Sequence, residues 1–317
     1  MQDIATVAGG LVGLAGAGGA ISVAVLRRAR PYLPTGHALT GTSAYPLPTA
    51  LKLGFAGMTA QVRPGPHGEL YLGSGAPQPG RTLRRLVLAP LFARAHAGGG
   101  RLWRNQQAPF RLVIEFGGDN RDTEALLRAY RMLDRQLQDH AALLSKCRGD
   151  ELVPGVVTVT VTGVVDVREL LAAQPERYAF ADGTFDDLGS HSAPPSLVPM
   201  ISEPWNRRFG WDGQEAITAE ERHQLHALIR AAHEDGRTVR ICGLPEGSSR
   251  RARAAVWSEL GAAGVDVIAD TDLTGLARHL RRHPVSPPPR SHLPTRAVRR
   301  SAPRPTAPRT VTHHEPV

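Results

Sequence analysis

The most constraining feature of this sequence is a regular alternation between short strand-like runs and longer helical runs. The strand-like runs, which are rich in apolar and β-branched residues, are Met58–Val62, Arg111–Phe116, Val156–Thr162, Val198–Ser202, Thr238–Cys242 and Val265–Ala269. The helical runs are Thr82–Ala97, Thr123–Leu144, Thr218–Asp235, Ser249–Ala262 and Asp272–Arg282. Strands that alternate with helices in this way favour a parallel sheet covered by helices.

The length of the alternating region favours one type of parallel α/β fold. It continues for about 250 residues without a GxGxxG loop, which suits a (β/α)8 barrel better than a dinucleotide-binding fold. Thr218, three residues before Glu221, predicts a capping box at the start of the long helix, and Gly236 predicts its end. We therefore expect an α/β protein with a single TIM-type (β/α)8 barrel over residues 31–283.

Composition and charge limit the classes of partner. The 317 residues are 41% hydrophobic and 21% charged, which is enough apolar material for an ordinary core. The net charge of +9 by itself suggests nucleic acid or anionic lipid, but about half of this excess lies after residue 283, where six Arg accompany one Glu. No aromatic residues interleave with the basic ones, so we expect no specific nucleic-acid partner.

The two cysteines do not form a recognisable motif. Cys147 and Cys242 are far apart and lack a CxxC spacing, which disfavours a disulfide or zinc site.

The first 30 residues form a segment of their own. The run from Ile4 to Leu26 is uncharged and apolar, and Arg27, Arg28 and Arg30 follow it. Its length predicts a single membrane span over residues 4–26, and the arginines behind it place the barrel on the cytoplasmic side. Two alternatives remain open. One is an exported protein whose signal peptide lost its basic start to a wrongly chosen initiator Met, and the other is an isolated amphiphilic tail.

The last segment, residues 284–317, is rich in Pro, Arg, Ser and Thr and has few apolar residues. Such a segment buries too little apolar surface to offset its ordering entropy, so we predict disorder. The sequence does not identify a partner for this tail.

Several short motifs follow one another in an order that is specific as a set. They are Gly80–Leu86 with Leu88 and Pro90-Leu91, Arg177–Ala179 with Asp182-Gly183, Pro199–Ser202 with Trp205, Phe209–Trp211, Thr238–Arg240, and Gly264–Asp266 with Asp272-Leu273. Through these motifs the chain resembles the superfamily of glycerophosphodiester phosphodiesterases and phosphatidylinositol-specific phospholipases C. Within it, the chain is most similar to the bacterial part of the branch named after the altered inheritance of mitochondria protein 6. The resemblance covers residues 36 to 282 and implies a barrel that cleaves phosphodiesters with the help of a divalent cation such as Mg²⁺ or Ca²⁺.

The catalytic histidines that the resemblance implies are only half present. Members of this superfamily open the first strand with His-Ala-His, and here that stretch is His37-Ala38-Leu39. The second catalytic histidine of the pattern corresponds to Ser74. Phosphodiester cleavage needs one group to deprotonate the attacking hydroxyl and another to protonate the leaving oxygen, and neither Leu nor Ser shuttles protons at neutral pH.

The metal ligands that the resemblance implies are depleted in the same way. The Glu-Ala-Asp of the second strand corresponds to Thr59-Ala60-Gln61, and only Glu115 on the third strand keeps a carboxylate. Mg²⁺ and Ca²⁺ prefer several hard, often anionic, oxygen ligands. Glu115 is therefore interpreted as a vestigial metal ligand, and we expect no bound cofactor.

Three further residues are candidates for a pocket that holds phosphate. Arg177 and Arg240 lie in matching motifs and carry the charge that a phosphate or carboxylate requires, and Trp205 is a candidate for the pocket wall. A phosphate-containing small molecule or lipid is accordingly the expected ligand.

We expect a catalytically impaired or inactive relative of the phosphodiesterases that serves as a membrane-associated binding protein. The main alternative is an active phosphoric diester hydrolase on glycerophosphodiester or phosphoinositide-like substrates, with a site rebuilt around His37 and Glu115. A third possibility is a membrane-tethered interaction protein in which the barrel is only a scaffold.

Overall fold

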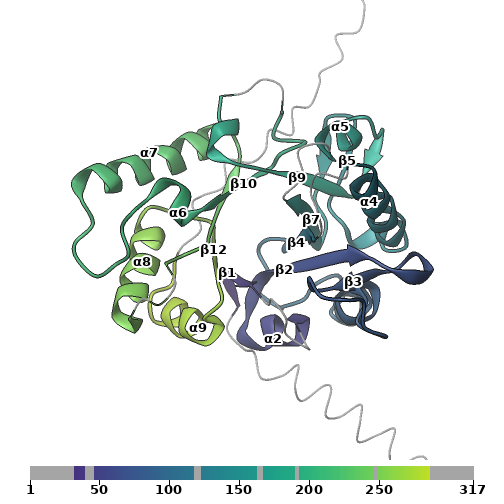
Figure 1. Cartoon of the computed structure of the whole chain (residues 1–317), viewed down its shortest axis with the longest axis horizontal. Helices are drawn as coiled ribbons and strands as arrows, with labels where there is room; N and C mark the ends of the chain where they lie inside the picture. The colour runs from purple at the N-terminus through teal and green to yellow at the C-terminus, as the bar shows by residue number, and fades with distance from the viewer. Residues whose placement is uncertain are drawn as a thin grey trace, which may run out of the picture.

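Eight parallel strands close into a barrel in the computed structural model (Figure 1). The structure describes residues 32–39, 46–117, 123–162, 167–189, 193–245, 247 and 249–285. Around the barrel, the strands are β1 (Leu33–Leu39), β2 (Phe55–Pro64), β4 (Phe110–Phe116), β7 (Val157–Thr162), β9 (Ala179–Gly183), β10 (Met200–Pro204), β11 (Thr238–Cys242) and β12 (Val267–Asp270). Because β1 pairs in parallel with both β12 and β2, the sheet has no free edge at this point.

Helices surround this barrel on the outside (Figure 1). They are α2 (Pro46–Leu53), α3 (Ala89–Ala97), α4 (Thr123–Gln138), α5 (Val167–Ala172), α6 (Trp205–Arg208), α7 (Ala219–Glu234), α8 (Arg250–Ala262) and α9 (Leu273–Arg282). Single turns occur at η1 (Pro66–Gly68), η3 (Ala141–Leu143) and η4 (Phe185–Asp187), and a wider π-helical turn, η2 (Arg84–Leu88), leads into α3. The main cluster of buried apolar side chains is contributed by the barrel strands and by these helices.

Two small additions extend the barrel. Strand β3 (Leu70–Leu72) pairs antiparallel with the end of β2. A separate antiparallel sheet contains β5 (Lys146–Arg148), flanked by β6 (Glu151–Val153) and β8 (Glu176–Arg177). Since β8 comes directly before β9, this second sheet lies near the amino-terminal end of the barrel strand.

The predicted barrel is confirmed, and most predicted elements match observed ones closely. Thr218 caps α7, because its Oγ1 accepts a hydrogen bond of 3.1 Å from the backbone N–H of Glu221. Gly236 follows the helix with a φ of +74°, a conformation that glycine adopts without strain. The strand-like runs omitted β1 and β9, since Pro34 and Gly36 interrupt the first and small residues dominate the second.

The predicted membrane anchor needs correction. Of the helices that the structure describes, none combines the length and the apolar character that crossing a bilayer requires. The run over residues 4–26, on which both the span and the cytoplasmic orientation rested, lies outside the described residues, as does the part of the predicted disordered tail over 286–317. The prediction of a single N-terminal span is therefore withdrawn.

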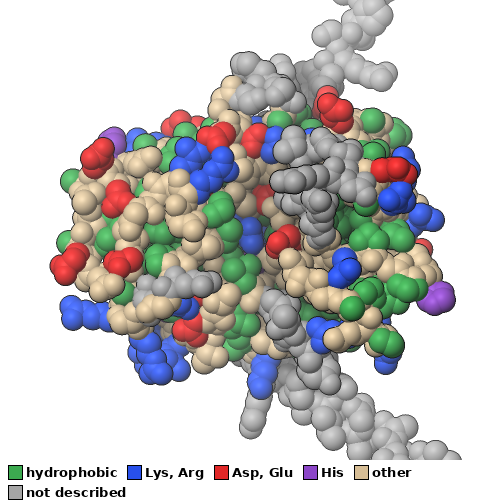
Figure 2. All heavy atoms as spheres, viewed as in Figure 1, with side chains coloured by type: hydrophobic (Ala, Val, Ile, Leu, Met, Phe, Trp, Pro, Cys, Tyr) green, Lys and Arg blue, Asp and Glu red, His purple; other side chains and the backbone are tan. Residues whose placement is uncertain are grey.

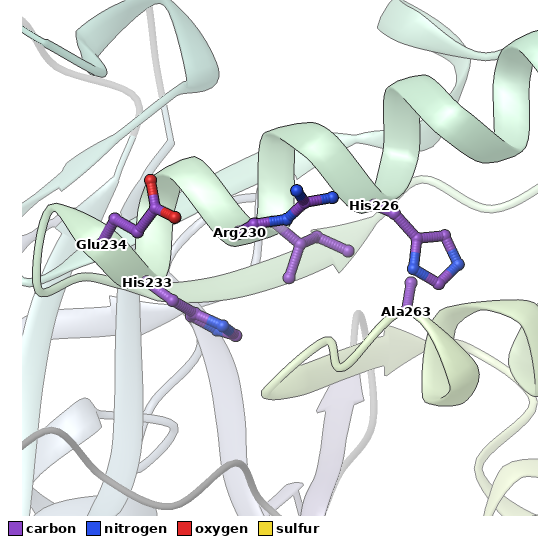
Figure 3. Close-up of a pocket in the computed structure, with 6 residues that line it drawn as sticks. His226, Arg230, His233, Glu234 and Ala263 are labelled. Atoms are coloured by element: carbon purple, nitrogen blue, oxygen red, sulfur yellow. The ribbon is translucent and has the colours of Figure 1, made fainter.

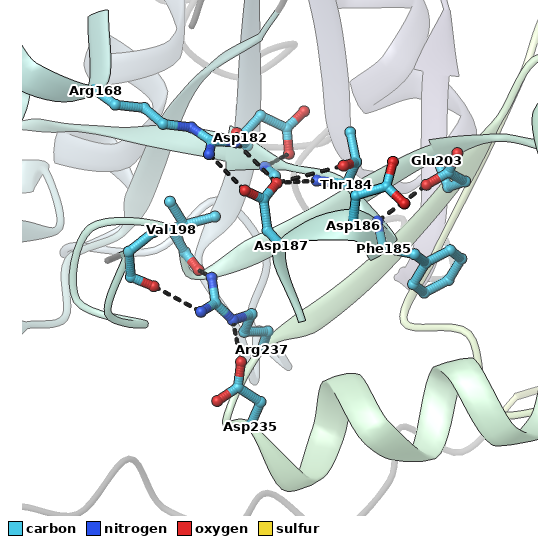
Figure 4. Close-up of polar contacts among 12 residues, drawn as sticks. Arg168, Asp182, Thr184, Phe185, Asp186, Asp187, Val198, Glu203, Asp235 and Arg237 are labelled. Atoms are coloured by element: carbon cyan, nitrogen blue, oxygen red, sulfur yellow. Dashed lines mark hydrogen bonds and ion pairs between the residues drawn. The ribbon is translucent and has the colours of Figure 1, made fainter. Parts of the chain in front are cut away.

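Arg237 connects the amino-terminal end of β11 to the end of α7 and to the loop before β10 (Figure 4). Its side chain is buried, and it donates hydrogen bonds to Asp235 Oδ2 at 2.6 Å, to the Val198 carbonyl at 2.9 Å and to the Ala193 carbonyl at 2.6 Å. Buried backbone carbonyls need such partners, because they have lost their hydrogen bonds to water. Arg237 thus supplies donors to three acceptors from three places in the chain.

Replacing Arg237 with Ala should lower the free energy of unfolding by about 3 kcal/mol or more, because the change leaves buried acceptors without donors. Urea-induced unfolding of the full chain, followed by circular dichroism, measures this change. Arg222→Ala is the matched control. Arg222 forms a two-bonded ion pair with Glu259 on the exposed surface, so its loss should change stability much less. Equal losses in the two variants would contradict the assigned role of Arg237.

Candidate functional site

The carboxyl-terminal ends of the eight barrel strands bring together a cluster of polar side chains. Parallel strands end at the same edge, and in (β/α)8 barrels this edge carries the functional groups. We call this group the polar cluster; its members are His37 on β1, Thr59 and Gln61 on β2, Glu115 on β4, Asp182 on β9, Ser202 on β10, and Arg240 and Cys242 on β11. Five of the sequence-predicted site positions, His37, Thr59, Gln61, Glu115 and Arg240, thus meet at this end.

A chain of hydrogen bonds connects four of these residues across the barrel. His37 Nε2 lies 2.9 Å from Thr59 Oγ1, and Arg240 Nη2 donates to the same hydroxyl at 3.0 Å. Arg240 Nη1 donates to Ser202 Oγ at 3.2 Å. The guanidinium therefore sits between the hydroxyls of β2 and β10, with the imidazole behind one of them.

His37 is held neutral by its surroundings. Its side chain is fully buried, and this burial lowers its pKa well below the ordinary value, with smaller contributions from the nearby charges of Arg240 and Arg111. Its Nδ1 makes no hydrogen bond to the described residues and faces Gly57, where an added Cβ would lie 2.5 Å away. An imidazole that is enclosed, neutral and already bonded through Nε2 is poorly placed to exchange protons with a substrate.

Asp182 is a buried carboxyl group of the cluster with a raised pKa. Burial raises its pKa to about 6, and this effect outweighs the attraction of Arg240. The Ser202 and Thr162 hydroxyls lie close enough to lower the pKa slightly, and the Gly183 N–H donates to Oδ1 at 3.2 Å. Oδ2 is buried and has no hydrogen-bond partner among the described residues. A carboxyl group with a near-neutral pKa in such a place is a recognised mark of a functional site.

The metal site that the resemblance implied does not fit the residues present. Thr59, at one ligand position, gives its hydroxyl to His37 and Arg240, so a guanidinium approaches where a cation would need an anionic oxygen. Gln61 turns its Nε2 toward Glu115 Oε1 at 3.5 Å, which places an amide donor against the one carboxylate of the predicted set. Nowhere in the described part of the chain do three or more His, Cys, Asp or Glu side chains gather closely enough to hold a metal ion.

Four positions named from the sequence do not join the cluster. Leu39 ends β1 with an apolar side chain, and Ser74 is exposed beyond β3, where its carbonyl accepts from Arg63 Nη1 at 2.8 Å. Arg177 lies in β8, before the start of β9 and so at the opposite end of that strand from Asp182; its Nη2 donates to the Ser196 carbonyl at 2.9 Å. The fourth position is Trp205.

Trp205 is a packing residue in this structure. It is 1% exposed, and its ring stacks on Phe209 with centroids 4.4 Å apart. Its Nε1 donates to the Trp211 carbonyl at 2.7 Å, so its single polar atom is already used. The side chain therefore supports the segment after β10 instead of lining an open pocket.

The turn after β9 holds Asp182 in place (Figure 4). Arg168 on α5 forms two hydrogen bonds to the Asp187 carboxylate, at 2.5 and 2.9 Å, and a third to the Asp182 carbonyl at 2.9 Å. Asp187 in turn accepts from the Thr184 N–H at 2.7 Å, and the Phe185 N–H donates to Glu203 Oε2 at 3.0 Å. The backbone on the carboxyl side of Asp182 is thus fixed to both α5 and β10.

The sequence contained a signal for the missed members of the cluster. Asp182 and Ser202 both occurred in motifs that carried the resemblance, although no role was assigned to either. Each lies in a strand of five residues, and the alternation of side chains along a strand places every second residue on the barrel interior. Recognising β9 as a strand would have placed Asp182 beside Arg240 and Ser202.

A hollow lies outside the barrel between α7 and the end of α8 (Figure 3). It is lined by His226, Ile229, Arg230, His233, Glu234 and Ala263. His233 Nε2 lies 2.8 Å from Asp266 Oδ2, which also accepts from the Val239 N–H at 2.8 Å, and this pairing raises the pKa of His233. These contacts lie at the amino-terminal ends of β11 and β12, opposite the polar cluster, and they give His233 a structural role.

Charges of both signs are interspersed over the face of the molecule shown in Figure 2. Lys and Arg side chains lie there among Asp and Glu side chains, and no single basic patch covers this face. A phosphate-rich polymer would favour a continuous basic surface.

Comparison with known proteins places the fold among solved barrels. No family model matches the sequence, and no curated protein is similar enough to match it. The structure is similar to a glycerophosphoryl diester phosphodiesterase from Parabacteroides distasonis, with a TM-score of 0.47 and 14% identity over 83% of this chain and 93% of that chain. It is also similar to a phosphatidylinositol-specific phospholipase C from Staphylococcus aureus, with a TM-score of 0.44 and 11% identity over 76% and 84% of the two chains.

A protein with a different kind of substrate is also among the similar structures. Cel5A from Thermotoga maritima, solved with a mannotriose substrate, has a TM-score of 0.42 and 12% identity over 80% of this chain and 99% of that chain. The superfamily that the motifs resemble is thus found among the similar structures, while the chemistry of this barrel has to be inferred from its own side chains.

The raised pKa of Asp182 predicts a specific dependence of stability on pH. The folded protein holds this proton up to about pH 6, whereas an unfolded chain releases it near the ordinary value of 3.8. The stabilisation that comes from this difference in pKa is complete when the pH is below the pKa of the unfolded chain. It is lost as the pH rises to the pKa of the folded protein, and the loss is on the order of 2–3 kcal/mol. In the isosteric variant Asp182→Asn this component should be absent.

Urea-induced unfolding of the wild type and of Asp182→Asn at several pH values across this window measures the prediction. The wild type should lose stability relative to Asp182→Asn as the pH rises from about 4 to about 6. The free energy of unfolding of the variant minus that of the wild type should therefore increase over this window. A difference that stays constant over the window would show that burial does not raise this pKa.

Proposed function

We propose that the carboxyl-terminal end of the barrel binds a small phosphate-containing ligand, and that the protein is a catalytically impaired relative of the PI-PLC-like phosphodiesterases. The observation that carries the proposal is that Arg240 is buried without an ion pair. Its side chain is 4% exposed and forms no ion pair with any described residue, and its Nε has no hydrogen-bond partner there. A buried cation without a direct ion pair is unfavourable, and an anionic ligand would relieve that cost.

The geometry of Arg240 supports an anion as that ligand. Both Nη atoms are used by neutral hydroxyls, Ser202 Oγ and Thr59 Oγ1, at distances of 3.2 and 3.0 Å. These contacts orient the guanidinium plane without neutralising it. A guanidinium remains charged at every physiological pH and recognises phosphate oxygens with a planar set of donors.

The impairment rests on the loss of proton-transfer groups. His37 is enclosed and neutral, Leu39 has no ionisable group, and Ser74 lies exposed beyond β3. The proposed ligand is accordingly bound but not cleaved at ordinary enzyme rates. Since the cation ligands are replaced, binding in this proposal requires no Mg²⁺ or Ca²⁺.

One observation favours a second candidate function. Asp182 has a pKa near 6 and shares the cluster with Arg240, so an acid–base group and a charge that could stabilise a phosphorane-like transition state lie together. An active phosphoric diester hydrolase with a rebuilt site would use Asp182 in place of the histidine pair. Its activity would then depend on Asp182 more than on His37.

Inorganic phosphate should stabilise the full chain against heat, and Arg240 should be responsible. At about a hundred times Kd, binding to the folded state adds about 2.7 kcal/mol, which is a visible shift in Tm. Arg240→Gln should abolish the shift, because it removes the charge and keeps a polar side chain. Differential scanning fluorimetry at increasing phosphate concentration measures this.

Arg207→Gln provides the control for the binding experiment. Arg207 is half-exposed and pairs with Asp186 at 2.8 Å, so its replacement changes the net charge of the protein equally without touching the cluster. Loss of the phosphate effect in both variants would point to a non-specific effect of charge. Retention of the effect in Arg240→Gln would overturn the proposed site.

Purified full-length protein should show no turnover of glycerophosphodiesters or phosphatidylinositol above a heat-inactivated control, with or without Mg²⁺ or Ca²⁺. Each acid–base group contributes on the order of 10²–10⁴-fold, so the loss of two should leave little activity. Turnover that disappears in Asp182→Asn would replace the binding function with the hydrolase. Turnover that disappears only in His37→Ala would mean that His37 exchanges protons despite its enclosure.

A further inference from the structure

Two buried atoms of opposite character lie unsatisfied in the same polar cluster. Asp182 Oδ2 accepts no hydrogen bond from the described residues, and Arg240 Nε donates none. The two side chains attract each other enough to affect the pKa of Asp182, yet they form no ion pair within 4.0 Å. The cluster thus contains a carboxyl group near the guanidinium that does not neutralise it through direct contact.

Several charged and titratable groups among the described residues surround Asp182. On its own turn, Arg168 and Asp187 neutralise each other, and the hydroxyls of Thr162 and Ser202 on the neighbouring strands are uncharged. Burial keeps the pKa of His37 low and raises the pKa of the Cys242 thiol, so both stay uncharged. The remaining groups are Glu115 on β4 across the barrel, Arg240 on β11, and the rim network of Glu203, Asp186, Arg207 and Arg208.

We propose that Asp182 takes up a proton when an anion binds at Arg240, so that the acidity of the surroundings regulates the affinity of the cluster. This inference rests on the proposed function, since it requires that an anion occupies the cluster. In the ionised form Asp182 repels an anion held by the guanidinium. In the protonated form Asp182 is neutral, so it no longer repels an anion held by Arg240. Its O–H can also donate a hydrogen bond at Oδ2, which has no partner among the described residues.

The direction of the effect is set by linkage. An anion near Asp182 makes its ionised form less favourable, so the bound complex holds the proton more tightly than the free protein does. By reciprocity the proton strengthens anion binding by the same factor. The affinity should therefore rise as the pH falls through about 6 and should level off once Asp182 is protonated in both states. A linkage of one pKa unit corresponds to about tenfold in affinity.

Sulfate is the probe for this inference, because it keeps the same charge across the pH range of interest, whereas phosphate changes its own. Isothermal titration calorimetry of the full chain should show a Kd that falls about tenfold or more between about pH 8 and about pH 5. Titrations near pH 6 in two buffers of different ionisation enthalpy should show net proton uptake on binding. That second measurement uses the wild-type protein alone and does not depend on any variant folding correctly.

Asp182→Asn should make sulfate affinity high and independent of pH, because the amide imitates the protonated acid in size and charge. Asp186→Asn is the matched control: it removes an Asp that is exposed at the rim and pairs with Arg207 and Arg208, and it should keep the full pH dependence. A pH-dependent Kd that survives in Asp182→Asn would overturn the inference, as would sulfate binding without proton uptake.

The same titrations separate the inference from the function on which it rests. Sulfate that binds through Arg240 with one Kd at every pH would overturn the proton linkage and leave the anion site standing. Sulfate that fails to bind at any pH, or that binds equally well to Arg240→Gln, would overturn the anion site and the linkage together.

Discussion

The rest of the structure depends on the closure of the sheet through β1. This strand pairs with β2 on one side and with β12 on the other, so the polar ends of the strands surround one enclosed interior. Thr59 and Arg240, which are 181 positions apart in the chain, meet there through a hydrogen bond. An open sheet with the same strands would let water satisfy such groups. In a closed barrel they must satisfy one another or remain unpaired, and that condition gives the polar cluster its chemistry.

The guanidinium of Arg240 supplies positive charge in this interior. A divalent cation needs several anionic ligands, and Thr59 and Gln61 offer none, whereas a guanidinium brings its own charge and needs only to be oriented. In the proposed function this difference explains how the barrel can keep an affinity for phosphate while it lacks the groups that would cleave a phosphodiester. Binding needs charge and shape, and hydrolysis needs proton transfer as well.

Two buried carboxyl groups show that the contacts of an acid, and not its burial alone, decide its part in the site. Glu203 is fully buried on β10, but its Oε2 accepts from the Phe185 N–H, and Arg207 and Arg208 approach its Oε1 at 3.6 and 3.5 Å. Asp182, on the neighbouring strand, has an oxygen with no partner among the described residues and a pKa near 6. Ion pairs thus connect Glu203 to the two arginines of the rim, while Asp182 has no such pair among the described residues. The proposed coupling between protons and anions uses this difference.

The sequence by itself determined the barrel, because β–α alternation, a helix cap at Thr218 and a glycine at position 236 are local signals that neighbouring residues complete. It also identified several members of the polar cluster from their motifs, namely His37, Thr59, Gln61, Glu115 and Arg240. Only the tertiary structure decided which of these touch, that Asp182 joins them, and that Arg177 lies at the other end of its strand. The physical reason is that contacts across a closed barrel depend on strand order and register, which are set by pairings between distant parts of the chain. Local periodicity carries no information about those pairings.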